Sequence, residues 1–211
     1  MPKLGIYYIP PGPPADNAAF YQAGKSILGY DIRAETENVT PPADIEHRIG
    51  FTAAWSVNAR QYGFHSTIVD VINCGEGDLP TLAERVSAIL GTFVPEENPF
   101  SLTRNDEEPI AWFTSGAVAL KYTANPHLRR FRRLLKEKIR PRSRGQWKPH
   151  FTLFDPYTGR RGGAVKKYLE EEFSEYSPLN VESVCLVVQR DGDPNFNIFQ
   201  ELPYRPEGTR P

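Results

Sequence analysis

The chain has 211 residues, of which 39% are apolar and 24% are charged, so it can bury a core and global disorder is excluded. The 25 basic and 26 acidic residues leave a formal net charge of −1, so the total charge indicates neither a nucleic acid nor a membrane as partner. The 20 prolines, about twice the usual share of roughly 5%, exclude an all-helical bundle and predict many turns and extended segments.

The first half of the chain is predicted to alternate between strands and helices. Residues 4–9 are apolar and β-prone and indicate a strand, and Asp16 is expected to cap a helix that ends near Gly29. Residues 34–48 are predicted to be a polar loop, and residues 62–72 alternate as a strand does. Capping-box spacing at 81–84 predicts the start of the next helix.

The second half continues the mixed pattern. Strands are predicted over 100–103, 111–122, 148–154, 181–189 and 196–202, and helices over 125–139 and 165–173. Asn125 followed by Pro126 is typical of a helix N-terminus. No linker divides the chain, so we expect an α+β fold with residues 1–211 in a single bilobed domain.

Two of the four histidines occur in matching contexts. His65 and His150, 85 positions apart, each begin the pattern His-x-Thr followed by an aliphatic residue, and each lies in a predicted strand. Because residues i and i+2 of a strand share a face, His65 is expected to project with Thr67, and His150 with Thr152. The residue between them faces the other way.

This pair of patterns suits phosphoryl transfer. One imidazole removes a proton from an attacking water or hydroxyl, and the other protonates the leaving oxygen. Each threonine hydroxyl can donate to a non-bridging phosphate oxygen. We therefore predict His65 and His150 as catalytic and Thr67 and Thr152 as phosphate-binding, with either histidine as the base. No metal or cofactor is required by this chemistry, and neither HxxxH nor CxxC occurs.

The two motifs resemble those of the 2H phosphoesterase superfamily. Residues 62–67, the early Tyr7-Tyr8-Ile9-Pro10-Pro11 and residues 23–31 are similar to its DUF1045-like branch, which is linked with phosphonate metabolism. The resemblance implies two antiparallel sheets with flanking helices around a central cleft. It also implies metal-free cleavage or formation of cyclic phosphodiesters, mostly 2′,3′-cyclic nucleotides or RNA ends. Where branch members commonly have a Lys-Pro-Pro-type segment, this chain has residues 68–71, which include Asp70.

Five further residues are candidates for substrate binding. Tyr62, three positions before His65, could stack on a base or donate to phosphate, and Lys148 is expected on the strand face of His150. Weaker candidates are Tyr7, Tyr122 and Lys121, for which a packing or surface role is the alternative.

Basic residues are concentrated in one segment. Residues 129–148 contain 10 of the 25 basic residues and a single acid, Glu137. Such a segment could contact a polyanion, and a solvated helix face is the alternative.

Three functions are therefore considered. The first is a metal-independent phosphodiesterase that hydrolyses a 2′,3′-cyclic nucleotide-like or 2′-linked phosphodiester, with a small phosphodiester, nucleotide or RNA end as substrate. The alternatives are a non-catalytic module that binds RNA or phosphate, and a transfer or cyclising enzyme acting on a small phosphate or phosphonate metabolite. The absence of a G-x-S-x-G sequence and of a P-loop excludes serine-hydrolase and P-loop kinase chemistry of those types.

Compartment is predicted from what the sequence lacks. No stretch approaches the ~18 apolar residues that a membrane span needs, and prolines interrupt the N-terminal apolar run too early for a secretory signal. Cys74 and Cys185 are expected to be reduced, packed thiols. We expect a cytoplasmic monomer without membrane contact.

Overall fold

The computed structural model of the protein describes residues 2–12, 17–72, 75–93, 100–139, 141 and 146–204. Its antiparallel strands are packed against helices, which confirms the predicted α+β class. The strands are β1 (Lys3–Tyr8), β2 (Tyr30–Asp31), β3 (Thr36–Glu37), β4 (Ser66–Ile72), β5 (Phe100–Arg104), β6 (Ile110–Trp112), β7 (Val118–Ala124), β8 (His150–Phe154), β9 (Leu179–Val181), β10 (Ser183–Gln189) and β11 (Asn197–Pro203). The α-helices are α1 (Ala18–Leu28), α2 (Ile45–Ile49), α3 (Val57–Arg60), α4 (Leu79–Leu90), α5 (Pro126–Ile139) and α6 (Gly162–Glu172), with 3-10 turns η1 (Ala53–Ser56) and η2 (Glu76–Asp78).

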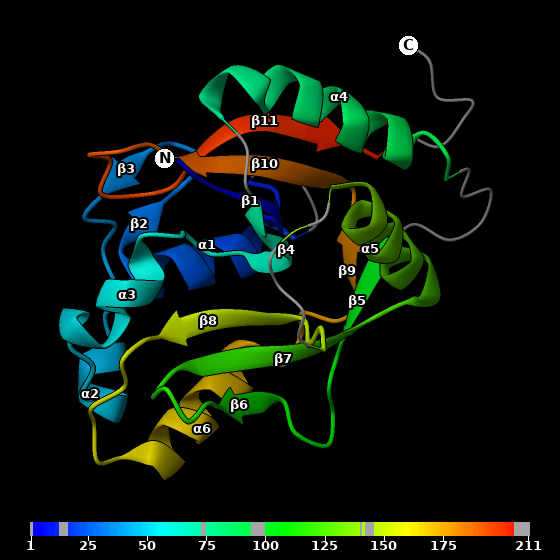
Figure 1. Cartoon of the computed structure of the whole chain (residues 1–211). Helices are drawn as coiled ribbons and strands as arrows, with labels where there is room; N and C mark the ends of the chain where they lie inside the picture. Colours follow the sequence, from blue (N-terminus) through cyan, green and yellow to red (C-terminus); the bar gives the residue numbers. More distant parts are fainter. Residues whose placement is uncertain are drawn as a thin grey trace.

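The main sheet is a continuous series of hydrogen-bonded strands that divides into two halves. Its strand order is β11-β10-β1-β4-β8-β7-β5-β9, with β6 paired to β7. In Figure 1, β11, β10 and β1 form an upper layer beneath α4, and β8, β7 and β6 form a lower layer beside α6. The two halves meet where β4 pairs β8, and the register there has the single pair Ser66 and Phe151. Among the described residues, the two expected sheets are thus joined into one nine-stranded sheet.

Helix α1 packs against the two central strands through an aromatic cluster. The Phe20 ring lies 5.0 Å from the ring of Phe64, which precedes β4, and 5.0 Å from the ring of Phe151 on β8. Gly24 permits this close approach, because a Cβ built there would lie 2.3–2.4 Å from three atoms of the Phe64 ring. The residues that flank Phe64 and Phe151 in sequence are therefore held by a tightly packed core.

Several element boundaries differ from the sequence expectations. The expected loop 34–48 contains β3 and α2, and the expected strand 111–122 is a hairpin because Gly116 turns the chain with φ +90°. Helix α4 begins at Leu79 with Pro80 in its first turn, so the capping-box spacing at 81–84 lies inside the helix. Strand β4 begins at Ser66, because hydrogen bonds from residues 62 and 63 to the end of α3 keep these residues in a turn.

Other local expectations are confirmed or fall outside the described residues. The Asn125 side chain accepts a hydrogen bond of 2.9 Å from the amide of Leu128, as its predicted capping role requires. Cys185 is a buried free thiol whose pKa is raised to about 12 by burial. Asp16 and Cys74 lie outside the described residues. Among the described residues, no helix has the length and apolar character needed to span a membrane.

Candidate active site

The middle residues of the two His-x-Thr sequences are register partners. Ser66 on β4 lies opposite Phe151 on β8 in an antiparallel pair, and both side chains are buried. Because neighbouring residues of a strand point to opposite faces, the histidine and threonine of each motif project from the other face. They are half-buried there, whereas Ser66 and Phe151 are 1% and 0% exposed.

The antiparallel register relates the two motifs by an approximate two-fold axis. Centred on the Ser66–Phe151 pair, it places His65 on the side of Thr152, and Thr67 on the side of His150. Burial chiefly lowers the pKa of the His65 imidazole, and the electrostatic influence of His150 lowers it further. Two histidines and two threonines that are 85 positions apart in sequence are thus brought to one face of the sheet.

The environment of His65 fixes its tautomer. Its Nδ1–H donates to the carbonyl of Gly63 at 2.9 Å, because a carbonyl oxygen can only accept. The Nε2 of the neutral ring therefore carries a lone pair and accepts the Thr67 hydroxyl proton at 3.0 Å. The Tyr7 ring stacks on the imidazole at 4.0 Å and 20°. Desolvation, and to a smaller extent His150, lower the pKa of His65 to about 4.

His150 has the same backbone anchor and a more open surrounding. Its Nδ1–H donates to the carbonyl of Lys148 at 2.7 Å, two residues upstream as in the first motif. The Phe113 ring lies 5.1 Å from the imidazole and is 37% exposed. Sequence reasoning missed Phe113, because the β6–β7 hairpin that brings it beside His150 was taken as one strand. The sequence signal for this hairpin turn was Gly116, which follows Phe113 by three positions.

The backbone conformation that orients His65 requires a glycine at position 63. Its φ is +67°, in the left-handed region where glycine is favoured. A Cβ at this position would lie 2.7 Å from the Cβ of Ile32. The carbonyl that holds Nδ1 of His65 therefore depends on a residue without a side chain.

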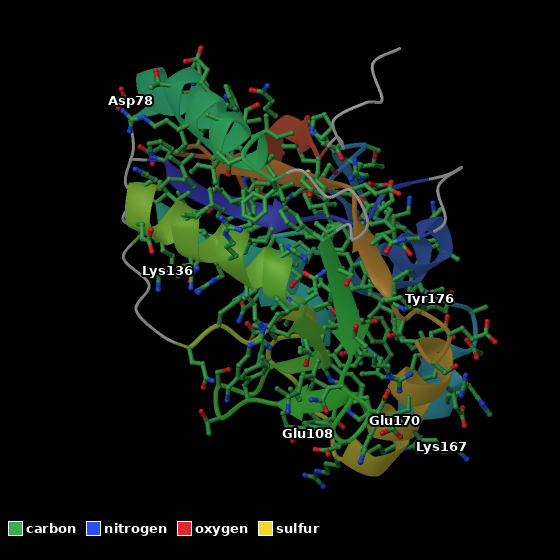
Figure 2. All side chains as sticks on the ribbon, turned by 90° about the vertical axis from the view of Figure 1, so that its right-hand side faces the viewer. Asp78, Glu108, Lys136, Lys167, Glu170 and Tyr176 are labelled. Atoms are coloured by element: carbon green, nitrogen blue, oxygen red, sulfur yellow. The ribbon has the colours of Figure 1, made fainter. Side chains whose placement is uncertain are left out.

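The structure brings some of the other candidates to this face. Tyr7 is buried beneath His65, and the Tyr62 ring lies 6.1 Å from His65 while it stacks on Phe196 at 4.9 Å. Lys121 is the register partner of His150 on β7, so both side chains share a face. Its ammonium pairs with the carboxylate of Glu108, which Figure 2 places near the β6 end of the molecule.

The structure places two of the candidates, Tyr122 and Lys148, differently from the sequence prediction. The Tyr122 side chain points to the opposite face from Lys121, is buried, and donates its hydroxyl to the carbonyl of Tyr176 at 2.9 Å. It is a core residue and does not join the group. Lys148 lies before β8, which begins at His150, so its position does not follow from strand alternation. Its side chain is exposed, and its carbonyl is what anchors the histidine.

The donor set of the site is imidazole and hydroxyl. Within the described residues, no group of three or more His, Cys, Asp or Glu side chains is arranged to hold a metal ion. Two Nε2 atoms and two threonine hydroxyls on one face can exchange protons with a bound anion and donate hydrogen bonds to it.

Comparison with known proteins gives structural likeness at low identity. No family model matches the chain, and no curated protein matches it. One crystal structure, of a phosphoesterase, is 11% identical with a TM-score of 0.47, and the match covers 96% of this chain and 98% of the phosphoesterase chain. The structure of E. coli LigT complexed with 3′-AMP is 14% identical, with a TM-score of 0.49 and the same coverage of both chains.

Proposed function

We propose that the protein is a metal-independent phosphodiesterase of the 2H type that hydrolyses a 2′,3′-cyclic nucleotide-like or 2′-linked phosphodiester. The observation that carries this proposal is the register of β4 and β8, which turns both His-x-Thr pairs onto one face about a shared axis. Two imidazoles and two hydroxyls provide an acid, a base and two donors for the phosphate. In this proposal the face forms the central cleft of a bilobed domain.

His65 is assigned as the general base. Its Nδ1–H is committed to the Gly63 carbonyl, so Nε2 is the acceptor of the ring. In the structure Nε2 accepts from the Thr67 hydroxyl, and in this proposal that hydroxyl turns to the bound phosphate and leaves Nε2 to the attacking water. With a pKa of about 4 the ring is neutral at pH 7 and able to accept a proton. His150 has the same Nδ1 anchor, and its Nε2 delivers a proton when the ring is an imidazolium.

The reaction then balances with water as the only co-reactant. The water oxygen attacks phosphorus and its proton passes to Nε2 of His65. The bond between phosphorus and the leaving ribose oxygen breaks, and that oxygen takes the proton from Nε2 of His150. Thr67 and Thr152 donate to the non-bridging oxygens, where negative charge develops. Loss of a proton from His65 and uptake of one by His150 restore the starting state.

The proposal is tested by turnover in EDTA. Purified protein is incubated with 2′,3′-cyclic AMP, and the product is identified by phosphorus NMR. His65→Ala and His150→Ala are each expected to lower kcat by about 10²- to 10⁴-fold, because each removes one proton-transfer group. Tyr122→Phe is the matched control, because its hydroxyl faces the core, and it should retain activity. Full activity in both histidine variants would exclude the mechanism.

Ring closure or transfer on a small phosphate or phosphonate metabolite would use the same four side chains. The same NMR experiment distinguishes it, because a cyclic or transferred product has a different phosphorus resonance from a hydrolysed monoester. The DUF1045-like motif residues 62–67 support including phosphonate esters among the substrates examined.

A further inference from the structure

The ammonium group of Lys121 projects from the sheet beside the proposed general acid. Lys121 on β7 is the register partner of His150 on β8, so the two side chains share a face. Like charges at directly opposed positions of neighbouring strands repel each other. An unpaired ammonium at position 121 would therefore disfavour the imidazolium form of His150, which is the form that the proposed mechanism requires.

A carboxylate from the loop between β5 and β6 balances this charge. Glu108 forms an ion pair with Lys121, at the β6 end of the molecule in Figure 2. The hydrogen bond from Lys121 lowers the pKa of the Glu108 carboxyl, and the charges of Lys148 and Lys166 lower it further. Glu108 is therefore ionised at neutral pH and carries a full negative charge next to Lys121.

The loop that carries Glu108 is folded around the backbone of Lys121. The amide of Asn105 donates to the Lys121 carbonyl at 3.0 Å, and the amide of Lys121 donates to the Pro109 carbonyl at 2.8 Å. The amide of Glu108 donates to the side-chain oxygen of Asn105 at 2.8 Å, which closes a turn. These backbone contacts keep Glu108 beside Lys121 independently of the ion pair itself.

The other groups around His150 do not supply a negative charge in place of Glu108. Lys148, two residues before His150, is exposed and adds a positive charge. His65 on β4 has a pKa of about 4 because it is buried, so it is neutral at pH 7, and the Phe113 ring beside His150 is apolar. Within the part of the chain that the structure describes, no ion pair involves His150 itself.

We propose that Glu108 is a positioning residue for the reaction, which neutralises Lys121 and so allows His150 to hold the proton that it passes to the leaving oxygen. This inference rests on the proposed function, in which His150 is the acid, and it adds a residue that acts on His150 through Lys121. Glu108 is 65% exposed, and ion pairs between exposed side chains contribute little to stability. Its removal should therefore change the proton affinity of His150 and leave the fold intact.

The proton affinity of His150 is measured by NMR on the free protein, without relying on turnover. The imidazole Cε1–H resonances are followed from pH 4 to pH 9, and the resonance of His150 is assigned by its absence from His150→Ala. Glu108→Gln is expected to lower the titration midpoint of His150 by about half a pH unit, since a unit charge about 7 Å away in largely aqueous surroundings changes a pKa by about that amount. Lys121→Gln should raise the midpoint by a similar amount, and the double variant should return it to within about 0.2 unit of the wild type.

Glu107→Gln is the matched control for the charge change. Glu107 precedes Glu108 on the same loop, is exposed, and takes part in no ion pair or side-chain hydrogen bond among the described residues, and the same holds for Asp106. Glu107→Gln should therefore leave the His150 midpoint unchanged. An unmoved midpoint in Glu108→Gln, or equal shifts in Glu107→Gln and Glu108→Gln, would overturn the inference.

Turnover then distinguishes failure of this inference from failure of the proposed function. The basic limb of kcat/KM for 2′,3′-cyclic AMP should move with the His150 midpoint, so Glu108→Gln should lower kcat/KM about threefold above that limb and leave it unchanged below. A shifted midpoint with an unmoved limb would overturn the inference, because the proton on His150 would not be the one that the reaction uses. A shifted midpoint in a protein that hydrolyses no phosphodiester would refute the proposed function instead, and would leave the effect of Glu108 on His150 standing.

Discussion

Acidification from pH 7 to pH 5 is expected to destabilise the protein through His65. The pKa of this imidazole is about 4 in the folded chain because the ring is desolvated, whereas an unperturbed histidine has a pKa near 6.5. Between these values the unfolded chain binds a proton that the folded chain does not, so the stability is present above pH 6.5 and is lost as the pH falls towards 4. The loss is about 2 kcal/mol between pH 7 and 5, and at most about 3 kcal/mol in total.

The assay is urea unfolding from pH 4.5 to 8 on the wild type and His65→Gln. The difference between the two curves isolates one group, because carboxylates with lowered pKa values, such as Asp31 and Glu201, titrate in both proteins. The wild type should lose about 2 kcal/mol relative to the variant between pH 7 and 5. A His65→Gln curve parallel to the wild type would refute the lowered pKa and the base assignment that uses it.

Three further predictions concern residues that position His65. Gly24→Ala should lower the free energy of unfolding by about 1–3 kcal/mol, because the new methyl meets the Phe64 ring, and an unchanged thermal midpoint would contradict this packing. Gly63→Ala should destabilise by about 1–2 kcal/mol from the positive φ alone and should lower kcat as well, and unimpaired kcat would show that the carbonyl of residue 63 does not orient the imidazole. Tyr7→Leu removes the ring stacked on His65, so the acid limb of kcat/KM should move up from about pH 4 towards pH 6.5, whereas an unmoved limb would assign the low pKa to another cause.

The His-x-Thr arrangement was predictable because its geometry is local. Strand alternation alone puts a residue on the face of its neighbour two positions away, and the burial of Ser66 and Phe151 agrees with this. The meeting of the two motifs is different, because it depends on the register between strands far apart in sequence. The structure supplies this register through the single pair of β4 and β8.

The surroundings of the histidines could not be predicted from local pattern. Phe113 reaches His150 through a hairpin whose turn rests on Gly116, and a run of β-prone residues does not reveal that turn. Tyrosine is a residue type that suits a substrate-binding site, so Tyr122 was a candidate. The register of β7 nevertheless places Lys121 on the face of the site and Tyr122 in the core. The stack of Tyr7 on His65, and with it the lowered pKa, depends on the pairing of β1 with β4.

The structure also shows that the basic residues within 129–148 have different surroundings. Of the residues within 129–148, the structure places Arg132 against β4, Arg130 over the Phe93 ring and Arg129 against the carbonyl of Ala124. Arg133 and Lys136 line a hollow beside Trp147. Arg140, Arg142 and Arg144 lie outside the described residues. The charge count of this segment allowed either a polyanion contact or a solvated helix face, and the helical periodicity of α5 determines which of its side chains share a face.

A crystal structure with adenosine 2′-monophosphate, one of the two monoesters that hydrolysis of 2′,3′-cyclic AMP can give, tests the central claim most directly. The account predicts that its phosphate lies between the two motifs, with non-bridging oxygens about 2.5–3.0 Å from the Oγ1 atoms of Thr67 and Thr152. It also predicts that Nε2 of His65 and of His150 both contact the phosphate group. A phosphate held by one motif alone, or bound away from both, would contradict the shared site.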